Sequence, residues 1–217
     1  MIHHVITRMA FKPDDPQWLW RLAFYRSMVL PRFLRQTDQE FDIWVRCYPV
    51  HNEIVDSLHP KVHPYQGYGI EDEIMGIDKT CQTHIPRSHI QTRVDCDDLV
   101  SDDFISRIHR EVACQPDKPL IVSFQPWKLD LYTLTRYRMG QRYHETSNSM
   151  FLSLYQPDIN GEYWDIYCFK HGHLARELGE SVRVVTIPEG YCDMVIHDKN
   201  MGTSILKGDK ALEVVNR

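Results

Sequence analysis

Short apolar runs along the first half of the chain predict a series of strands. Residues 4–9 (HVITRM) form an apolar run with β-branched side chains, which is typical of a strand. Residues 41–49 alternate between apolar and polar positions and end in a proline, which predicts a second strand. Residues 90–94 and 119–124 predict a third and a fourth strand.

A longer amphipathic segment between the first two strands predicts a buried helix. Asp15 is placed to cap its N-terminus, and Pro16 suits the first helical position. Pro31 lacks a backbone N–H and predicts a kink or a break. The apolar positions that follow the helical period are Leu19, Leu22, Ala23, Phe24, Met28, Val29 and Phe33.

The order of elements beyond residue 100 sets the fold class. A second helix is predicted from near Ser101, with Asp102 and Asp103 in its first turn, where carboxylates favour the helix dipole. Strand-like pieces then follow at short intervals, at residues 129–138, 150–156, 165–171 and 182–188. Strands and helices that alternate, followed by β-rich segments, predict an α/β fold with a mainly parallel central sheet and a smaller β-containing C-terminal portion. No linker or internal repeat divides the chain, so we expect a single domain over residues 1–217.

Composition narrows the class of protein. With 25 Lys and Arg against 30 Asp and Glu, the formal net charge is −5, so no global field attracts nucleic acid or an anionic membrane. No apolar run approaches the ~20 residues that cross a bilayer, and we expect a cytoplasmic protein. The 6 cysteines form no CxxC pair, which favours reduced thiols over a disulfide scaffold or a zinc site of four cysteines.

An acidic cluster follows the third predicted strand directly. On an extended backbone Asp95 and Asp97 point to the same side and can converge on one hard cation, while Asp98 faces the other way. Parallel sheets bind ligands at the carboxyl ends of their strands, and the cluster lies at such an end. Arg93, two residues upstream, offers a guanidinium for a phosphate group. The alternative is a solvated acidic turn that caps the following helix.

Several segments together resemble a known family. The segment TRVDCDDLVSDDFISRI resembles the T-R-x-D-x-D-D-x-x-x-x-D-F motif of the rhamnosyltransferase family, a branch of the glycosyltransferases with the GT-A fold. HVITRMAF is similar to the opening strand of that family, and FYRSMVLPRFLRQTDQEFDIWV to its block of R, P, Q and F. NSMFLSL and VIHDKNMGTSILKG are similar to two of its later segments. The matching pieces keep the family's order over most of the chain.

The resemblance implies a transferase that moves a sugar from a nucleoside diphosphate sugar to a saccharide or other hydroxyl acceptor, with Mn²⁺ or Mg²⁺ as the cofactor. It also implies a nucleotide-binding half at residues 1–125 and an acceptor-side half at residues 126–217. From the net charge we expect no nucleic-acid partner. The implied roles are metal binding for Asp97 and His197, and contact with the ribose or the metal for Asp95. Asp98 is implied as a catalytic residue that faces the donor sugar or orients the Asp95–Asp97 pair, and Thr7, Arg8 and Asn200 are implied to contact the nucleotide.

Transfer of a sugar also requires positive charge near the leaving diphosphate and, in some enzymes, a base for the proton of the acceptor hydroxyl. Arg93, Lys199 and Lys207 are candidates to neutralise the diphosphate. An enzyme that inverts the anomeric centre needs a general base, and Glu145 is our preferred candidate ahead of Asp165 and Glu189, because it lies in a polar segment beside the suspected acceptor loop. An enzyme that retains configuration needs no such base.

Some features depart from the family or favour alternatives. The second predicted strand ends in Arg46, Cys47 and Tyr48, without the carboxylate that reads the base in many GT-A enzymes. A set of Cys168, His171 and His173 could bind zinc, but a fourth ligand at ordinary spacing is missing. The alternative functions are a nucleotidyltransferase, for which the glycine-rich phosphate loop is not visible, and a non-catalytic module that binds a nucleotide sugar or a carbohydrate.

Overall fold

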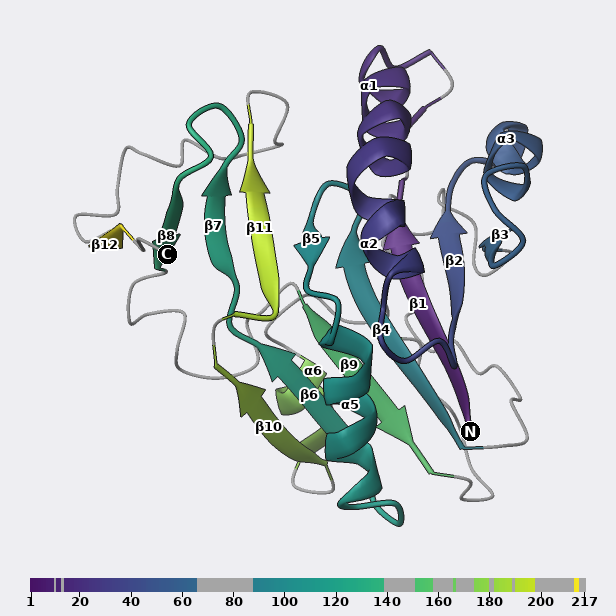
Figure 1. Cartoon of the computed structure of the whole chain (residues 1–217). Helices are drawn as coiled ribbons and strands as arrows, with labels where there is room; N and C mark the ends of the chain where they lie inside the picture. The colour runs from purple at the N-terminus through teal and green to yellow at the C-terminus, as the bar shows by residue number, and fades with distance from the viewer. Residues whose placement is uncertain are drawn as a thin grey trace.

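A seven-stranded sheet forms the centre of the structure (Figure 1). The computed structural model describes residues 1–9, 11–12, 14–65, 88–138, 151–157, 166, 174–179, 182–188, 190–197 and 213–214. The strands of this sheet are β1 (Ile2–Arg8), β2 (Asp42–Arg46), β3 (Val62–Pro64), β4 (His89–Asp95), β6 (Leu120–Phe124), β9 (Leu152–Gln156) and β10 (Arg183–Ile187). Their order across the sheet is β10-β6-β9-β4-β1-β2-β3.

Most strand pairs in the large sheet are parallel. Strands β4, β1, β2 and β3 are parallel neighbours, as are β6 and β10. Strand β9 lies between β4 and β6 and is antiparallel to both. The predicted α/β class with a mainly parallel sheet is confirmed. The C-terminal strands are shared between two sheets, because β9 and β10 complete the large one.

A second sheet of five strands stands beside the first. Its strands are β5 (Leu99–Val100), β7 (Trp127–Asp130), β8 (Arg136–Arg138), β11 (Cys192–Ile196) and β12 (Glu213–Val214), in the order β12-β8-β7-β11-β5. The strand-like piece predicted over residues 129–138 is in fact the end of β7, a turn and β8, which pair antiparallel. Arg136 of β8 donates two hydrogen bonds to the Asp193 carboxylate of β11, at 2.8 and 2.7 Å. This bidentate pair joins strands on either side of β7.

The amphipathic segment after β1 is helical, with one irregular turn. It consists of α1 (Gln17–Phe24), a π-helical turn (Tyr25–Val29) and α2 (Leu30–Leu34). The Leu30 N–H donates to the carbonyl of Tyr25, five residues back, just before Pro31. Since Pro31 has no N–H to continue the α-helical pattern, the wider turn accommodates it without ending the helix.

The buried side of this helix differs from the expected one. Leu19 is 71% exposed and Met28 is also exposed, whereas Trp18 and Arg21 are buried. The prediction that Leu19 and Met28 lie on the core face is wrong. Ala23, also predicted on the core face, is exposed as well. Met28 lies within the π-helical turn, which inserts one residue into the period, whereas the buried side of α1 is the one on which Trp18 stacks on His51.

Helices cover both faces of the large sheet (Figure 1). Helices α1, α2 and α5 (Phe104–Ala113) lie on one face, where Trp18, Phe24 and Phe104 pack with Val5 and other strand residues. Helix α6 (Leu174–Leu178) covers the other face, where Leu174 joins a smaller cluster. A short helix pair, a 3₁₀ turn (Pro49–His51) and α3 (Asn52–Asp56), follows β2.

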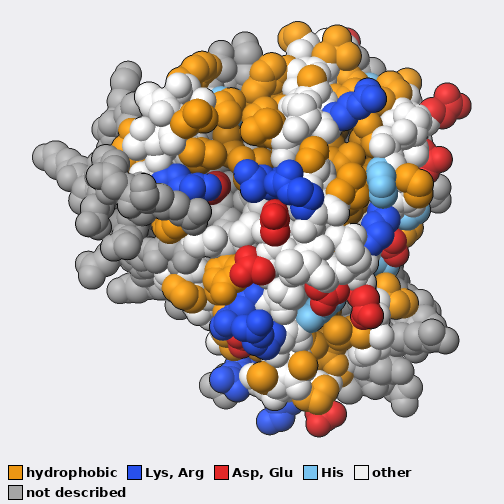
Figure 2. All heavy atoms as spheres, in the orientation of Figure 1, with side chains coloured by type: hydrophobic (Ala, Val, Ile, Leu, Met, Phe, Trp, Pro, Cys, Tyr) orange, Lys and Arg blue, Asp and Glu red, His pale blue; other side chains and the backbone are white. Residues whose placement is uncertain are grey.

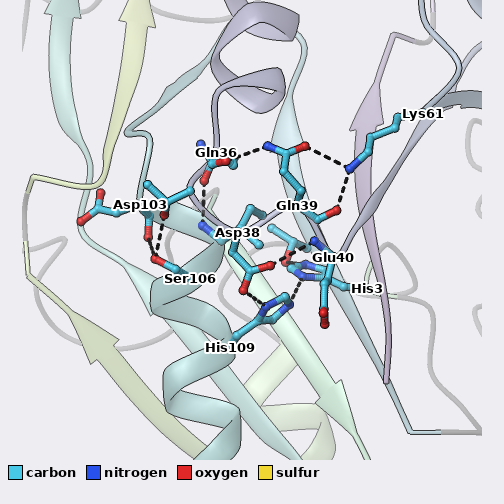
Figure 3. A network of polar contacts seen from close by, with 12 residues as sticks. His3, Gln36, Asp38, Gln39, Glu40, Lys61, Asp103, Ser106 and His109 are labelled. Carbon is cyan, nitrogen blue, oxygen red and sulfur yellow. Dashed lines mark hydrogen bonds and ion pairs between the residues drawn. The ribbon is translucent and has the colours of Figure 1, made fainter.

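Helix α5 begins later than the sequence predicts. Its first residue is Phe104, and Asp102 and Asp103 precede it, so the expectation that they lie in its first turn is wrong. The Ile105 N–H is satisfied by the Gln36 side-chain oxygen at 2.9 Å, and the Gln36 amide donates to the Ser101 carbonyl at 2.6 Å (Figure 3). A glutamine from the end of α2 therefore performs the capping expected of the local carboxylates.

A chain of polar side chains runs from the surface of α5 into the large sheet (Figure 3). His109 donates from Nδ1 to the Asp38 carboxylate at 2.7 Å, and its Nε2 lies 2.8 Å from His3 Nδ1. His3 Nε2 lies 2.7 Å from the Thr92 hydroxyl, which lies 2.7 Å from the Ser153 hydroxyl. With both histidines neutral, each donor in the chain meets one acceptor.

This arrangement predicts that stability falls as the pH is lowered. Burial, and next the nearby His109, hold the pKa of His3 well below 6.5. Below pH ~6.5 the unfolded chain binds a proton at His3 that the folded chain does not, so His3 alone contributes a slope of up to about 1.4 kcal/mol per pH unit. We expect His3→Gln to flatten the pH dependence of the unfolding free energy between pH 7.5 and 5.5, measured by urea denaturation.

His4 and Asp38, which lie near His3, also lower the stability of the folded chain as the pH falls. Burial also lowers the pKa of His4, although Asp42 opposes the shift. Burial raises the pKa of Asp38, but hydrogen bonds from Glu40 N–H and His109, with the charge of Lys61, outweigh it and lower that pKa, so its contribution is lost only below pH ~4. Ser57→Ala, at an exposed position outside this hydrogen-bond network, changes no titratable group and should keep the parent slope. A parent slope in His3→Gln would contradict the prediction.

On the face of the molecule that includes α1 and the five-stranded sheet, many of the exposed side chains are apolar (Figure 2). Figure 2 shows hydrophobic groups over the upper part of this face and a band of Lys and Arg below them. The exposed large apolar residues on these elements include Leu19, Met28, Tyr132 and Leu134. Among the helices that the structure describes, none is long and apolar enough to span a membrane.

Candidate active site

The carboxyl ends of three parallel strands meet at one edge of the large sheet. Arg8, near the end of β1, is in register with Arg46 on β2 and with Asp95 on β4. Ligands of parallel α/β sheets bind at this edge, because the loops there converge without covering it. The predicted residues Thr7, Arg8 and Asp95 therefore lie on adjacent strands at the expected place.

The acidic cluster is a turn and not a continued strand. β4 ends at Asp95, and the Asp98 N–H donates to the Asp95 carbonyl at 3.1 Å. The prediction that Asp95 and Asp97 alternate along an extended backbone is therefore wrong. The turn instead moves Asp97 off the line of the strand, toward α1 and the five-stranded sheet.

Asp98 connects the turn to β11. It is almost fully buried, and its Oδ1 accepts a hydrogen bond from the Val195 N–H at 3.1 Å. Burial, and next the charge of Asp95, raise the pKa of the Asp98 carboxyl well above 3.8. In this structure Asp98 holds two sheets together, and its predicted contact with the donor sugar stays a prediction.

Asp97 and His197 come together from positions 100 residues apart. The Asp97 Oδ2 lies 3.0 Å from the His197 Nε2, and both side chains are buried. His197 follows β11 directly, and β11 pairs with β5, which follows the acidic turn. Strand pairing therefore places the histidine beside the carboxylate. The metal binding that the family resemblance implies for these two residues stays a prediction.

Arg21 completes this cluster. Its guanidinium Nη1 forms an ion pair with the same Asp97 Oδ2, and the arginine is only 4% exposed. The guanidinium carbon lies 5.4 Å from the ring centroids of Phe11 and of Trp20, within cation–π range. The sequence analysis did not identify Arg21. The available signal was a single arginine three residues after Trp18, on a helix that was predicted to be buried.

Aromatic contacts fix α1 at this edge. Trp18 stacks on His51, which follows β2, with 3.7 Å between ring centroids and 12° between ring planes. Trp20 lies with its ring centroid 4.4 Å from that of His197. The helix that carries Arg21 is thus held against both the β2 loop and the end of β11.

Asp95 and Arg93 lie on the same strand as the turn. The Asp95 Oδ1 is 3.9 Å from the Arg93 Nε, beyond hydrogen-bond range, and this oxygen is buried without a hydrogen bond. Arg93 is buried and lies in register with Leu152 of β9. Its guanidinium is therefore largely shielded from solvent at the carboxyl edge of the sheet, and its predicted contact with phosphate stays a prediction. Arg8 is exposed at the edge, whereas Thr7 is fully buried.

Other predicted residues lie outside the described part of the chain. They are the general-base candidates Glu145, Asp165 and Glu189, the nucleotide candidate Asn200, the lysines Lys199 and Lys207, and the zinc candidates Cys168, His171 and His173. Their roles stay predictions.

Asp97 and His197 are predicted metal ligands that lie in contact with each other. Across residues 1–9, 11–12, 14–65 and 88–138 and the shorter described segments, no group of three or more His, Cys, Asp or Glu side chains converges. The pair of Asp97 Oδ2 and His197 Nε2 is spaced by 3.0 Å, however, which is the separation of neighbouring ligands about 2.1 Å from an octahedral ion. Asp95 Oδ1, the buried oxygen without a hydrogen bond, belongs to the last residue of β4, just before the turn that carries Asp97.

Comparisons with solved structures give low similarity. The chain is similar to the crystal structure of S. aureus TarS residues 1–349 in complex with UDP-GlcNAc, with 12% identity, a TM-score of 0.47, and coverage of 92% of this chain and 60% of that chain. For S. aureus TarS the identity is 10% and the TM-score 0.44, over 90% of this chain and 37% of that one. The chain thus spans less than two thirds of either TarS chain.

Comparison with family models identifies the family. No curated protein sequence matches the chain. A family model described as "Putative rhamnosyl transferase" matches residues 7–208, which include every predicted site residue from Thr7 to Asn200. The resemblance seen in the sequence is confirmed, and the chain belongs to the putative rhamnosyl transferase family.

Proposed function

We propose that this protein is a glycosyltransferase that moves a sugar from a nucleoside diphosphate sugar to a hydroxyl group of a saccharide or glycoconjugate, with Mn²⁺ or Mg²⁺ bound at Asp97 and His197. Family membership supports the reaction class. The observation that carries the proposal is the buried pair of Asp97 and His197 at the carboxyl edge of the parallel sheet.

The residues at this edge have distinct tasks in the proposed reaction. A bound divalent cation would neutralise charge that develops on the departing diphosphate. Asp97 and His197 would hold that cation, with Asp95 as a further ligand. Arg8, exposed at the end of β1, would contact the nucleotide, and Asn200 would lie near its diphosphate. Asp98 would keep the acidic turn docked on β11 through its bond to Val195, so that Asp97 keeps its position.

The acceptor side of the reaction depends on stereochemistry. If the reaction inverts the anomeric centre, a carboxylate such as Glu145 would take the proton of the attacking hydroxyl. If it retains configuration, the departing phosphate can take that proton. The family description suggests rhamnose as the transferred sugar.

Slow hydrolysis of the donor tests the proposal against a binding module. A transferase that stabilises the leaving diphosphate should release it to water when no acceptor is present. We expect Mn²⁺- or Mg²⁺-dependent release of nucleoside diphosphate from at least one sugar nucleotide in a panel that includes nucleoside diphosphate rhamnose, glucose and N-acetylglucosamine, followed by chromatography. Excess chelator should stop the release.

The same assay separates the alternatives. Tight binding of a sugar nucleotide with no diphosphate after long incubation, with or without saccharide acceptors, would favour the non-catalytic module. Formation of a sugar nucleotide from a sugar phosphate and a nucleoside triphosphate, with release of pyrophosphate, would favour the nucleotidyltransferase.

A further inference from the structure

Arg21 lies where a cation bound to Asp97 would lie. Its guanidinium and the His197 ring contact the same carboxylate oxygen, Asp97 Oδ2. Arg21 and Asp97 are 4% and 7% exposed, so their charges are largely removed from water. A buried carboxylate requires a counter-charge, and Arg21 supplies it in the ion-free protein.

A divalent cation at the same carboxylate would change this balance. It would bring two positive charges close to a guanidinium that lies within cation–π range of Phe11 and Trp20, and like charges at short range in a poorly solvated site repel strongly. Asp97 Oδ2, which contacts both Arg21 and His197, would also have to become a metal ligand. Binding of the cation therefore requires that Arg21 give up its contact with Asp97.

A diphosphate offers the displaced guanidinium a new partner. Arginine binds phosphate oxygens by charge-assisted, often bidentate, hydrogen bonds, and the donor diphosphate would lie on the cation beside Asp97. In the exchange the Arg21–Asp97 contact breaks, and contacts of Asp97 with the cation and of Arg21 with phosphate form. The negative charge of the diphosphate then balances the added positive charge.

We propose that Arg21 pairs with Asp97 while no cation is bound and passes to the donor diphosphate when the cation binds. Arg21 then disfavours the cation alone and favours the cation together with the diphosphate, so the two bind cooperatively. This inference rests on the proposed function, because it takes Asp97 as a metal ligand.

Opposite changes in two affinities test the role of Arg21. The parent protein, Arg21→Met and Arg21→Gln are titrated calorimetrically with Mn²⁺ alone and with the preformed complex of Mn²⁺ and inorganic pyrophosphate. We expect both variants to bind Mn²⁺ alone about tenfold more tightly and the pyrophosphate complex about tenfold more weakly. A purely structural role would not move the two affinities in opposite directions.

A matched variant controls for net charge. Arg107→Gln removes one positive charge from α5, where Arg107 pairs with Glu111 of the same helix. It should leave both affinities within about twofold of the parent values, since Arg107 is partly exposed to solvent and its charge is balanced by Glu111. A gain in Mn²⁺ affinity equal to that of Arg21→Met would overturn the local role of Arg21.

Thermal unfolding keeps the inference testable if loss of Arg21 weakens the fold. With chelator present, Arg21→Met should unfold at a lower temperature than the parent, and Mn²⁺ should raise its midpoint more than that of the parent, because tighter binding to the folded state stabilises it more. An equal or smaller rise in Arg21→Met overturns the inference.

Asp97→Asn separates failure of this inference from failure of the proposed function. If Asp97→Asn loses Mn²⁺ binding while Arg21→Met binds Mn²⁺ like the parent, the metal site stands and the role of Arg21 is overturned. If Mn²⁺ binding survives in Asp97→Asn, or no variant binds Mn²⁺, the proposed metal site and the inference are both overturned.

Discussion

Asp97→Asn is expected to abolish cation-dependent hydrolysis of the donor, with a loss of at least about 100-fold. The substitution keeps the size of the side chain but removes the charge that faces Arg21 and His197. A neutral amide is a weak ligand for a hard divalent cation, so the charge on the leaving diphosphate would not be neutralised. Diphosphate release and calorimetric binding of Mn²⁺ with a nucleoside diphosphate are the measurements.

A second carboxylate close in sequence provides the control. The Asp102 side chain is half exposed and forms a long ion pair with Arg35, at 3.7 Å. Asp102→Asn should retain parent rates and parent metal affinity. Undiminished hydrolysis and metal binding by a well-folded Asp97→Asn protein would remove Asp97 from the metal site.

Phe104→Ala is expected to produce the largest loss of stability, about 3–5 kcal/mol, or roughly 10 °C in the unfolding midpoint of a domain of this size. Phe104 is fully buried at the start of α5 and lies 4.4 Å from Phe124 of β6 between ring centroids. Removing its ring leaves a cavity between the helix and the sheet, and the close-packed surroundings relax only partly. Urea denaturation and thermal unfolding measure the change.

The matched comparison uses an apolar side chain that is exposed. Leu19→Ala removes part of a side chain that is 71% exposed on α1, and we expect a change within ±0.5 kcal/mol. A loss below about 1 kcal/mol in Phe104→Ala would contradict the packing of α5 against β6.

Strands β4 and β6 could be predicted because each contains a short run of apolar or β-branched side chains and is buried along nearly its whole length. Residues 90–94 and 119–124 were predicted as strands and are found within one residue of β4 and β6. The position of β9 between them could not be predicted, since an apolar strand such as Leu152–Gln156 fits the centre of any sheet equally well. Strand order depends on long-range pairing that local patterns do not contain.

Within the candidate site, the residues were predictable where a motif marks them. Asp97 and His197 were identified from family segments, and the structure brings them together. Arg21 carries no local signal of function, because its role arises from the placement of α1 over the end of the sheet. Gln36 was missed for the same reason, since its side chain caps a helix that begins 68 residues later along the chain.

The central place of β9 has a consequence for synthesis of the chain. Until Gln156 has left the ribosome, β4 and β6 cannot acquire the strand that joins them, and their facing edges stay open. At ~5–20 residues per second, the delay after β4 emerges lasts on the order of several seconds. During this interval the nascent chain presents unpaired apolar edges, so it should depend on chaperones more than a protein whose sheet is assembled in the order of its sequence.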